Sequence, residues 1–257
     1  MVLSSFRKEV LMKPTISPVG DCAISIDFGQ VIDPKINRHI RQTIERIQEL
    51  KLDGITELVP TYCALLIQYD AMLYSYSDIC NLMEPLLEPS ATDDANERVT
   101  VIEIPTVYGG EFGPDLGFVA SHNNLSEDEV VSIHSGTDYL VYMLGFIPGF
   151  TYLGGMDPRI ATPRLSSPRT LIPAGSVGIA GEQTGTYPSD SPGGWQIIGR
   201  TPVTMYDMSK EQAALLSAGD YVRYVPIDEA EYNRVKALGS DYVPSMYEVE
   251  VGELRGY

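Results

Sequence analysis

One stretch of the chain is unusually rich in glycine and proline, and it limits the folds that the sequence can adopt. Residues 144–205 contain 11 Gly and 8 Pro, whereas the whole chain of 257 residues contains 23 Gly and 18 Pro. This density excludes long helices and is typical of short strands joined by shaped loops, as in a β-barrel. Apolar residues persist through the stretch, among them Ile179, Ile197 and Ile198. We therefore predict a folded domain here and not a low-complexity linker.

The first 105 residues alternate between strand and helix patterns. Asp33 and Pro34 open the first helix with an N-cap carboxylate followed by a proline, and Gly54 follows its end. The hydrophobic pattern predicts strands at 23–28, 55–59, 64–69 and 99–104, and helices at 34–50 and 79–87. The order βαββαβ predicts a small ferredoxin-like sandwich. The polar residues between 88 and 98 are expected to form a linker.

Beyond residue 105 the helices are few and short. One is predicted near 114–120, and another begins after Ser126, with Glu129 completing a capping box. A strand is expected at 221–225, followed by a helix that Asp228 caps. Residues 240–257 are polar, acidic and aromatic, and they form either a docking tail or a loose end.

Composition excludes several classes of protein. Hydrophobic residues make up 44% of the chain, enough to build a packed core. The net charge of −17 argues against nucleic acid or an anionic membrane surface as a partner. No run approaches eighteen apolar residues, and residues 1–13 lack the apolar core of a signal peptide. The three cysteines, Cys22, Cys63 and Cys80, give no disulfide framework. We therefore expect a cytoplasmic protein with no membrane span.

Familiar catalytic motifs are missing from the sequence. No Gly-Lys pair forms a phosphate loop, and no His or Cys spacing indicates a metal site. Ser176 lies in AGSVG, which resembles a nucleophile elbow, but that motif needs a helix after the serine. Gly181 and Gly185 follow and prevent one. We predict that Ser176 supplies a hydroxyl in a tight loop, where it donates a hydrogen bond to a ligand.

The glycine-rich stretch contains arginine but no lysine. Its four arginines are Arg159, Arg164, Arg169 and Arg200, against three acidic residues. Arginine without lysine, on loops shaped by glycine, suits bidentate recognition of a carboxylate or phosphate. The alternative is that each arginine pairs with a nearby acid or carbonyl.

Aromatic residues and one histidine leave two interpretations open. Phe146, Phe150 and Trp195 are either part of a barrel core or the lining of a site for a small ligand with a polar head. His134 ends a predicted helix, so it is either a general base or a charge that favours the helix C-terminus.

Read together, the motifs are recognisable. They are GDCA at 20–23, ELVPTY at 57–62, YGGEFGPDL at 108–116, GFIPGF at 145–150, YLGG at 152–155, PAGSVGIAG at 173–181, QTG at 183–185, SPGGW at 191–195 and IGRTP at 198–202. This set resembles the family of the bacterial 5-oxoprolinase B subunit, also called allophanate hydrolase subunit 1, which includes the sporulation kinase inhibitor KipI. The likeness extends over about residues 14–228.

The resemblance implies an α+β fold of two domains. A ferredoxin-like amino-terminal domain at 14–90 would follow an extension at 1–13. A cyclophilin-like β-barrel would occupy 91–228, and a carboxy-terminal helix and tail would occupy 229–257.

The resemblance also implies an activity and partners. With the carboxyltransferase-like C subunit of 5-oxoprolinase and its A subunit, this chain would convert 5-oxoproline, ATP and water to glutamate, ADP and phosphate. It would be inactive alone, and which chain binds ATP is left open. Two alternatives remain: a KipI-like inhibitor of a sensor histidine kinase, or a component of a urea or allophanate-type carboxyltransferase.

Site roles follow from this resemblance as expectations. The four arginines would hold the carboxylate of 5-oxoproline or a phosphate on its lactam oxygen. His134 or Tyr142 would transfer a proton. The expected binding residues are Ser176, Gln183, Phe146, Phe150 and Trp195.

Overall fold

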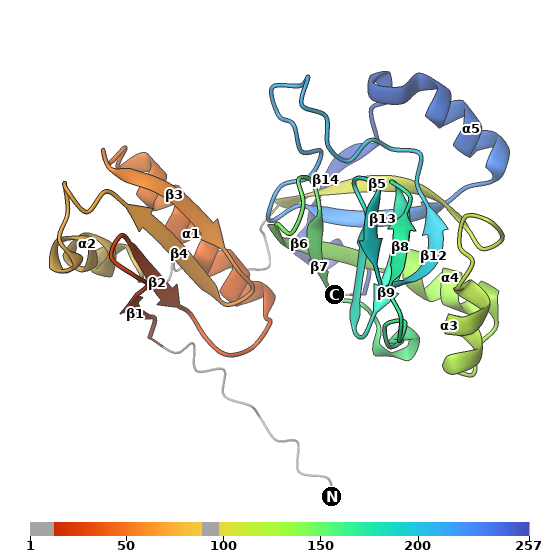
Figure 1. The fold of residues 1–257 in the computed structure, drawn as a ribbon, viewed down its shortest axis with the longest axis horizontal. Coiled ribbons are helices and arrows are strands. Elements are labelled where there is room, and N and C mark those ends of the chain that lie inside the picture. The colour runs from red at the N-terminus through yellow and green to blue at the C-terminus, as the bar shows by residue number, and fades with distance from the viewer. Residues whose placement is uncertain (1–12, 89–97, 257) are drawn as a thin grey trace, which may run out of the picture. The chain divides into compact units, whose positions relative to one another are not determined.

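A computed structural model describes residues 13–88 and 98–256 of the chain. The chain divides into two compact units, residues 1–92 and 93–257. The first contains a four-stranded sheet with two helices, and the second a larger sheet with three helices (Figure 1). The fold is therefore mixed α/β.

The sheet of the first unit is antiparallel throughout, in the order β1-β2-β4-β3. Its elements are β1 (Thr15–Pro18), β2 (Ala23–Asp27), α1 (Pro34–Glu49), β3 (Ile55–Pro60), β4 (Ala64–Tyr69), α2 (Tyr76–Met83) and the 3₁₀ turn η1 (Glu84–Leu86). Asp33 caps α1 by accepting a hydrogen bond from the backbone N–H of Lys35, as its sequence predicts. Ile36, Ile40 and Ile47 then line the buried face of α1, which packs on the sheet.

A ferredoxin-like arrangement is not confirmed for this unit. The strand expected at 99–104 lies instead in the larger sheet, as part of β5 (Arg98–Tyr108). The edge position beside β2 is filled by β1, which precedes it in the chain. The cause is the burial of β5, where Val101, Ile102 and Ile104 are each at most 2% exposed. A strand with apolar residues buried on both of its faces belongs in the centre of a covered sheet, not at the edge of a small one.

The sheet of the second unit is nearly closed and resembles a barrel. Its strand order is β10-β9-β12-β5-β13-β6-β7, with β14 beside β5. The other strands are β6 (Asp138–Leu144), β7 (Thr151–Gly154), β9 (Ser176–Ala180), β10 (Gln183–Thr186), β12 (Gln196–Arg200), β13 (Tyr221–Pro226) and β14 (Met246–Glu250). Only β13 and β5 pair in parallel among the described strands. The two end strands, β10 and β7, approach each other and so nearly close the sheet.

Short strands fill the glycine- and proline-rich stretch, as its composition predicts. The strands between residues 151 and 200 are three to five residues long. Two of them, β8 (Arg169–Ile172) and β11 (Ser191–Gly193), form a separate two-stranded sheet.

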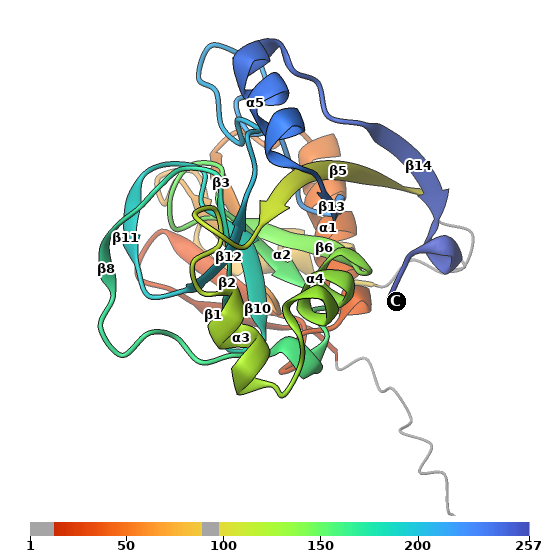
Figure 2. The ribbon, with the colours of Figure 1, turned by 90° about the vertical axis from the view of Figure 1, so that its right-hand side faces the viewer.

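Helices and apolar side chains complete the second unit. α3 (Leu116–His122) and α4 (Glu127–Ser135) lie side by side, and α5 (Glu229–Leu238) contacts β5 (Figure 2). Ser126 and Glu129 form the predicted capping box of α4. The barrel core is the buried cluster that includes Ile104, Val141 and Val177.

The carboxy-terminal segment is not a loose tail. Residues 246–250 form β14, which pairs antiparallel with the first half of β5. Val251 and Leu254 are each 8% exposed, so the chain after β14 also packs on the unit. Apolar and acidic residues alternate over 247–250, which is a strand pattern. Our expectation for this segment rested on its polar composition alone and so did not include the strand.

Within residues 13–88 and 98–256, no helix is long and apolar enough to cross a membrane.

Candidate functional site

Three neighbouring strands, β9, β10 and β12, carry three of the predicted binding residues on one face: Ser176, Gln183 and Arg200. Val177 and Ile179 of β9 point into the barrel core. Because side chains alternate along a strand, Ser176, Gly178 and Ala180 lie on the opposite face. We call this face of β9, β10 and β12 the outer face.

An aromatic cluster packs on the outer face. It consists of Phe150, Tyr187 and Trp195, whose ring centroids lie 5.8 to 6.0 Å apart in edge-on pairs. The sheet beneath it has room for the indole because β9 and β10 carry glycine there. A Cβ atom at Gly185 would lie 3.4 Å from the Trp195 ring, and one at Gly178 would lie 3.3 Å from its Cβ. The aromatic cluster is at most 9% exposed, so it is first of all a packed core.

Phe146 stands at the exposed edge of this cluster. Its ring lies 5.8 Å from that of Phe150, and the residue is 70% exposed. Its φ is 70°, a left-handed conformation that is rare for a bulky side chain. The tight loop is held by a hydrogen bond from the N–H of Gly145 to the carbonyl of Phe150. The loop thus keeps an aromatic ring in solvent at a cost in backbone strain, which is a feature of functional segments.

Tyr187, Ser176 and Arg200 form a row across the outer face. The N–H of Tyr187 donates to the carbonyl of Ser176, and Ser176 is the cross-strand partner of Arg200. Two atoms of this row, Ser176 Oγ and Arg200 Nε, are buried with no hydrogen-bond partner among the described residues. Buried polar atoms are nearly always paired, so two adjacent exceptions indicate a place where a ligand or water is bound.

The Arg200 guanidinium is held from the other side by two aromatic rings. It lies 5.9 Å from the centroid of the Phe112 ring and hydrogen-bonds the Tyr232 side chain. Phe112 and Tyr232 also contact each other, with centroids 4.8 Å apart. Arg200 is therefore fixed and half-buried.

Arg164 and Arg169 lie near the aromatic cluster. Arg169 donates to Asp115 at 2.7 Å and to the carbonyl of Trp195 at 3.3 Å. Arg164 is exposed. Burial raises the pKa of the Tyr187 phenol, while the charges of Arg164 and Arg169 act in the opposite direction. These two arginines therefore bring positive charge to the Tyr187 end of the row.

Arg159 is not brought to this group. It forms an ion pair with Asp157 at 2.6 Å, and its side chain is 67% exposed. The two residues lie at the turn η3 (Pro158–Ile160), from which Thr162 bridges to Gly181 just after β9 ends. Arg200 is paired with Ser176 at the opposite end of β9. The four arginines thus do not form one cluster.

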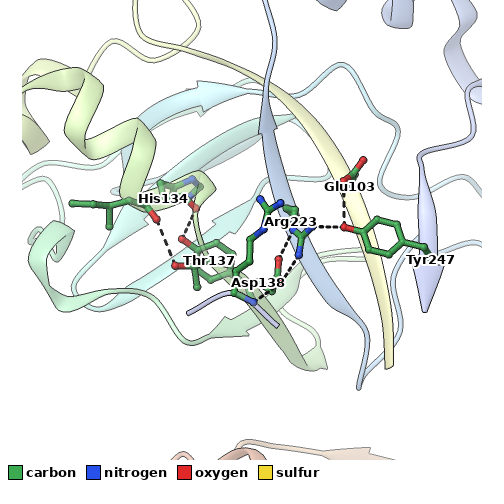
Figure 3. Close-up of polar contacts among 9 residues, drawn as sticks. Glu103, His134, Thr137, Asp138, Arg223 and Tyr247 are labelled. Carbon is green, nitrogen blue, oxygen red and sulfur yellow. Dashed lines mark hydrogen bonds and ion pairs between the residues drawn. The ribbon is translucent and has the colours of Figure 1, made fainter. Parts of the chain in front are cut away.

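His134 is enclosed inside the barrel. Its Nδ1 lies 2.8 Å from the Tyr108 hydroxyl and its Nε2 lies 2.8 Å from Thr184 Oγ1. Burial lowers the pKa of His134 to about 3, so the ring is neutral at physiological pH. Its backbone carbonyl accepts from the Tyr139 hydroxyl, at the end of α4 (Figure 3). The ring is 0% exposed and lies on the inner side of β10, so it does not face the outer-face site.

Tyr142 and Gln183 lie apart from the row formed by Tyr187, Ser176 and Arg200. Tyr142 is 3% exposed, and its ring packs directly over Gly154 of β7. Gln183 is half-buried at the start of β10, paired with Ala180.

Sequence reasoning missed three residues that hold this site together. They are Phe112, Asp115 and Tyr232. Asp115 lies at the start of the helix predicted near 114–120, and in the structure it directly precedes α3. Its bond to Arg169 joins residues 54 positions apart, and no local pattern signals such a contact. Among the described residues, no group of three His, Cys, Asp or Glu side chains is arranged to hold a metal ion.

Comparisons with known proteins define the class. Residues 14–216 match the family model "Carboxyltransferase domain, subdomain C and D". The chain is also similar in fold to the Kluyveromyces lactis urea amidolyase, with a TM-score of 0.75 at 21% identity, over 92% of this chain and 16% of that one. A crystal structure of a conserved uncharacterized protein from Pyrococcus horikoshii is 48% identical, with a TM-score of 0.51, over 85% of this chain and all of that one.

Curated relatives narrow the family. The 5-oxoprolinase B subunit of Bacillus subtilis is 44% identical over 234 residues, which are 86% of this chain and 96% of that protein. The 5-oxoprolinase B subunit of Escherichia coli O157:H7 is 55% identical over 128 residues, which are 50% of this chain and 59% of that protein. The chain therefore belongs to the family of 5-oxoprolinase B subunits, and the resemblance seen in its motifs is confirmed.

Proposed function

We propose that this chain is the B subunit of a cytoplasmic, ATP-dependent 5-oxoprolinase that opens 5-oxo-L-proline to L-glutamate together with its A and C partners. The family membership supports the reaction. The observation that carries the site is the pair of buried, unpartnered donors, Ser176 Oγ and Arg200 Nε, next to the aromatic cluster. We further propose that the barrel-like sheet is of the cyclophilin-like type.

ATP is needed because a lactam is a resonance-stabilised amide with a poor leaving group. In the proposed reaction the lactam oxygen attacks the γ-phosphorus of ATP, and the bond to ADP breaks. Water adds to the activated carbon, the ring C–N bond breaks, and the nitrogen takes up a proton. A second water then adds to the acyl carbon of the resulting acyl phosphate, the C–O bond breaks, and phosphate leaves with the former lactam oxygen. Charge develops on oxygens at each step, so positioned donors lower the barrier.

The outer face supplies suitable donors for such an anion. Arg200 and Ser176 offer an N–H and an O–H from paired positions of β12 and β9, and Arg164 and Arg169 add positive charge near Tyr187. Phe146 and the aromatic cluster provide apolar surface for the ring of 5-oxoproline, whereas Gln183 pairs with Ala180 at the other end of β9 and is left aside. The proposal leaves Arg159 aside, because its turn lies at the opposite end of β9 from Ser176 and Arg200. It assigns no proton transfer to His134 or Tyr142, since both are at most 3% exposed.

A carboxyltransferase component of urea metabolism is the second candidate. The urea amidolyase of Lachancea kluyveri is 27% identical over 278 residues, 91% of this chain but 15% of that protein. The full-length agreement with the 5-oxoprolinase B subunit of Bacillus subtilis favours the first proposal.

An isotope experiment on the reconstituted complex tests the proposal. The chain is co-purified with its A and C partners and given ATP and 5-oxoproline labelled with ¹⁸O at the lactam carbonyl. We expect glutamate and ADP in equal amounts and the label in the released phosphate. Omitting this chain should abolish glutamate formation. Turnover of urea-derived substrates in place of 5-oxoproline would favour the second candidate.

A further inference from the structure

Asp115 occupies the N-cap position of α3, yet its side chain does not cap the helix. It directly precedes Leu116, and its carboxylate makes no capping hydrogen bond to that helix. Aspartate is among the best N-cap residues, because its carboxylate accepts hydrogen bonds from the free backbone N–H groups of the first turn. The carboxylate is therefore engaged elsewhere.

Both oxygens of this carboxylate bind groups beyond the helix. Oδ2 accepts the backbone N–H of Ile197 at 2.6 Å, and Oδ1 accepts Nη2 of Arg169 at 2.7 Å. The N–H of Asp115 also donates to the carbonyl of Ile197 at 2.9 Å. Asp115 thus joins the start of α3 to β12 and fastens Arg169 of β8 to both.

Arg169 is held from a second direction as well. Its Nη1 donates to the carbonyl of Trp195, so the guanidinium lies beside the aromatic cluster. Its side chain remains 33% exposed, and its charge acts on Tyr187. A guanidinium has five N–H donors, of which Asp115 and Trp195 engage two. The remaining donors of this planar group, which we call the fork, can still bind an anion.

The geometry points to Asp115 as a positioning residue, which orients Arg169 toward the anionic group of the substrate on the outer face. This inference rests on the proposed function. Its alternative is that Asp115 acts only as a neighbouring negative charge. The two roles predict different kinetics. A lost charge would strengthen anion binding and lower KM, whereas lost orientation lowers kcat because the fork no longer meets the substrate in a productive position.

The first test is Asp115→Asn in the reconstituted complex. The amide oxygen can still accept from Ile197, so the strand contact is kept while the bond to Arg169 is lost. We expect kcat to fall about tenfold or more, with no decrease in KM for 5-oxoproline. Thermal unfolding and size-exclusion chromatography check folding and assembly. The matched control is Glu248→Gln, which removes a carboxylate from an ion pair with Arg98 in which both side chains are over 60% exposed.

A double-mutant cycle then tests whether Asp115 acts through Arg169. If it does, Asp115→Asn combined with Arg169→Ala loses no more activity than Arg169→Ala alone. Arg169→Lys, which keeps the charge but not the fork, should resemble Asp115→Asn. Losses that add, or a lower KM with unchanged kcat, would overturn the inference.

A binding measurement separates this inference from the proposed function. Trp195 is the single tryptophan of the chain, and Arg169 bonds its carbonyl, so its fluorescence reports on this place. The wild type and the variants of the cycle are titrated with 5-oxoproline and with inorganic phosphate. As for turnover, we expect the double variant to bind each anion no more weakly than Arg169→Ala alone. A complex that binds phosphate in this way but does not act on 5-oxoproline would refute the proposed function alone. Absence of any response to either anion in the wild type would overturn the role of Asp115.

Discussion

The guanidinium of Arg223 donates two hydrogen bonds of 2.6 Å to the carboxylate of Asp138 in the interior of the second unit (Figure 3). The Asp138 side chain is fully buried and that of Arg223 is 10% exposed. Asp138 also accepts the backbone N–H of Arg255, and Arg223 donates to the Tyr247 hydroxyl on β14. One ion pair therefore ties β13 and β6 to the carboxy-terminal segment.

Breaking this pair should destabilise the fold strongly. Arg223→Met leaves the Asp138 carboxylate buried without its main partner, which costs about 3–5 kcal/mol in free energy of unfolding. Urea denaturation measures the loss. Glu248→Gln, which breaks the exposed pair with Arg98, should cost under about 1 kcal/mol. Equal effects of the two variants would contradict the structural role of Asp138.

The burial of His134 predicts a dependence of stability on pH. Its pKa is about 3 in the folded protein and ordinarily 6.5, so the unfolded chain binds more protons between these values. Stability therefore rises with pH across this window and is lost as pH falls from about 6.5 toward 3, by about 1.4 kcal/mol per unit from this group. Denaturation at several pH values should show a shallower slope for His134→Gln. An unchanged slope would mean that the imidazole is not buried in a neutral form.

Ser176 offers a test that separates stability from function. An unpartnered buried hydroxyl costs about 1–3 kcal/mol, so Ser176→Ala should not lower the free energy of unfolding of the isolated chain. The same change should slow the complex, because the donor is lost from the site. Arg200→Ala should reduce kcat/KM by about 10²–10³-fold, and Arg159→Ala by much less. If Arg159→Ala has the larger effect, the site lies at the other end of β9.

Replacing Phe146 should also separate stability from function, by raising the first and lowering the second. Glycine adopts the left-handed conformation without strain, and Phe146 buries little surface, so Phe146→Gly should raise the unfolding free energy by about 1 kcal/mol. Turnover of the complex should fall, since the exposed ring is lost. A variant that is less stable would show that the ring contributes to the core and is not kept for function.

The periodic parts of the fold were predictable from the sequence, whereas the long-range contacts were not. Asp33 and Pro34 marked the start of α1, and the density of glycine and proline predicted the short strands. The strand near Val101 was also predicted, but its sheet was wrong, because pairing partners are set by tertiary burial and not by local pattern.

Some residues of the site were likewise predictable from the sequence, and others were not. Ser176, Arg200 and Trp195 were named from motifs and composition, and the sheet register brings Ser176 and Arg200 together. His134 illustrates the limit, since a histidine near a helix end looks the same in sequence whether it faces solvent or two buried hydroxyls. Asp115 illustrates the converse, because in sequence it is an acid at the start of a short predicted helix, whereas in the structure it is the ion-pair partner of Arg169.

The most direct measurement is the addition of this chain to purified A and C partners, with glutamate and ADP followed together. The account predicts that ATP-dependent glutamate release from 5-oxoproline appears only when this chain is present. It also predicts that the rate falls by at least about tenfold when the added chain carries Arg200→Ala. Glutamate release at the full rate without the chain, or an unchanged rate with that variant, would contradict it.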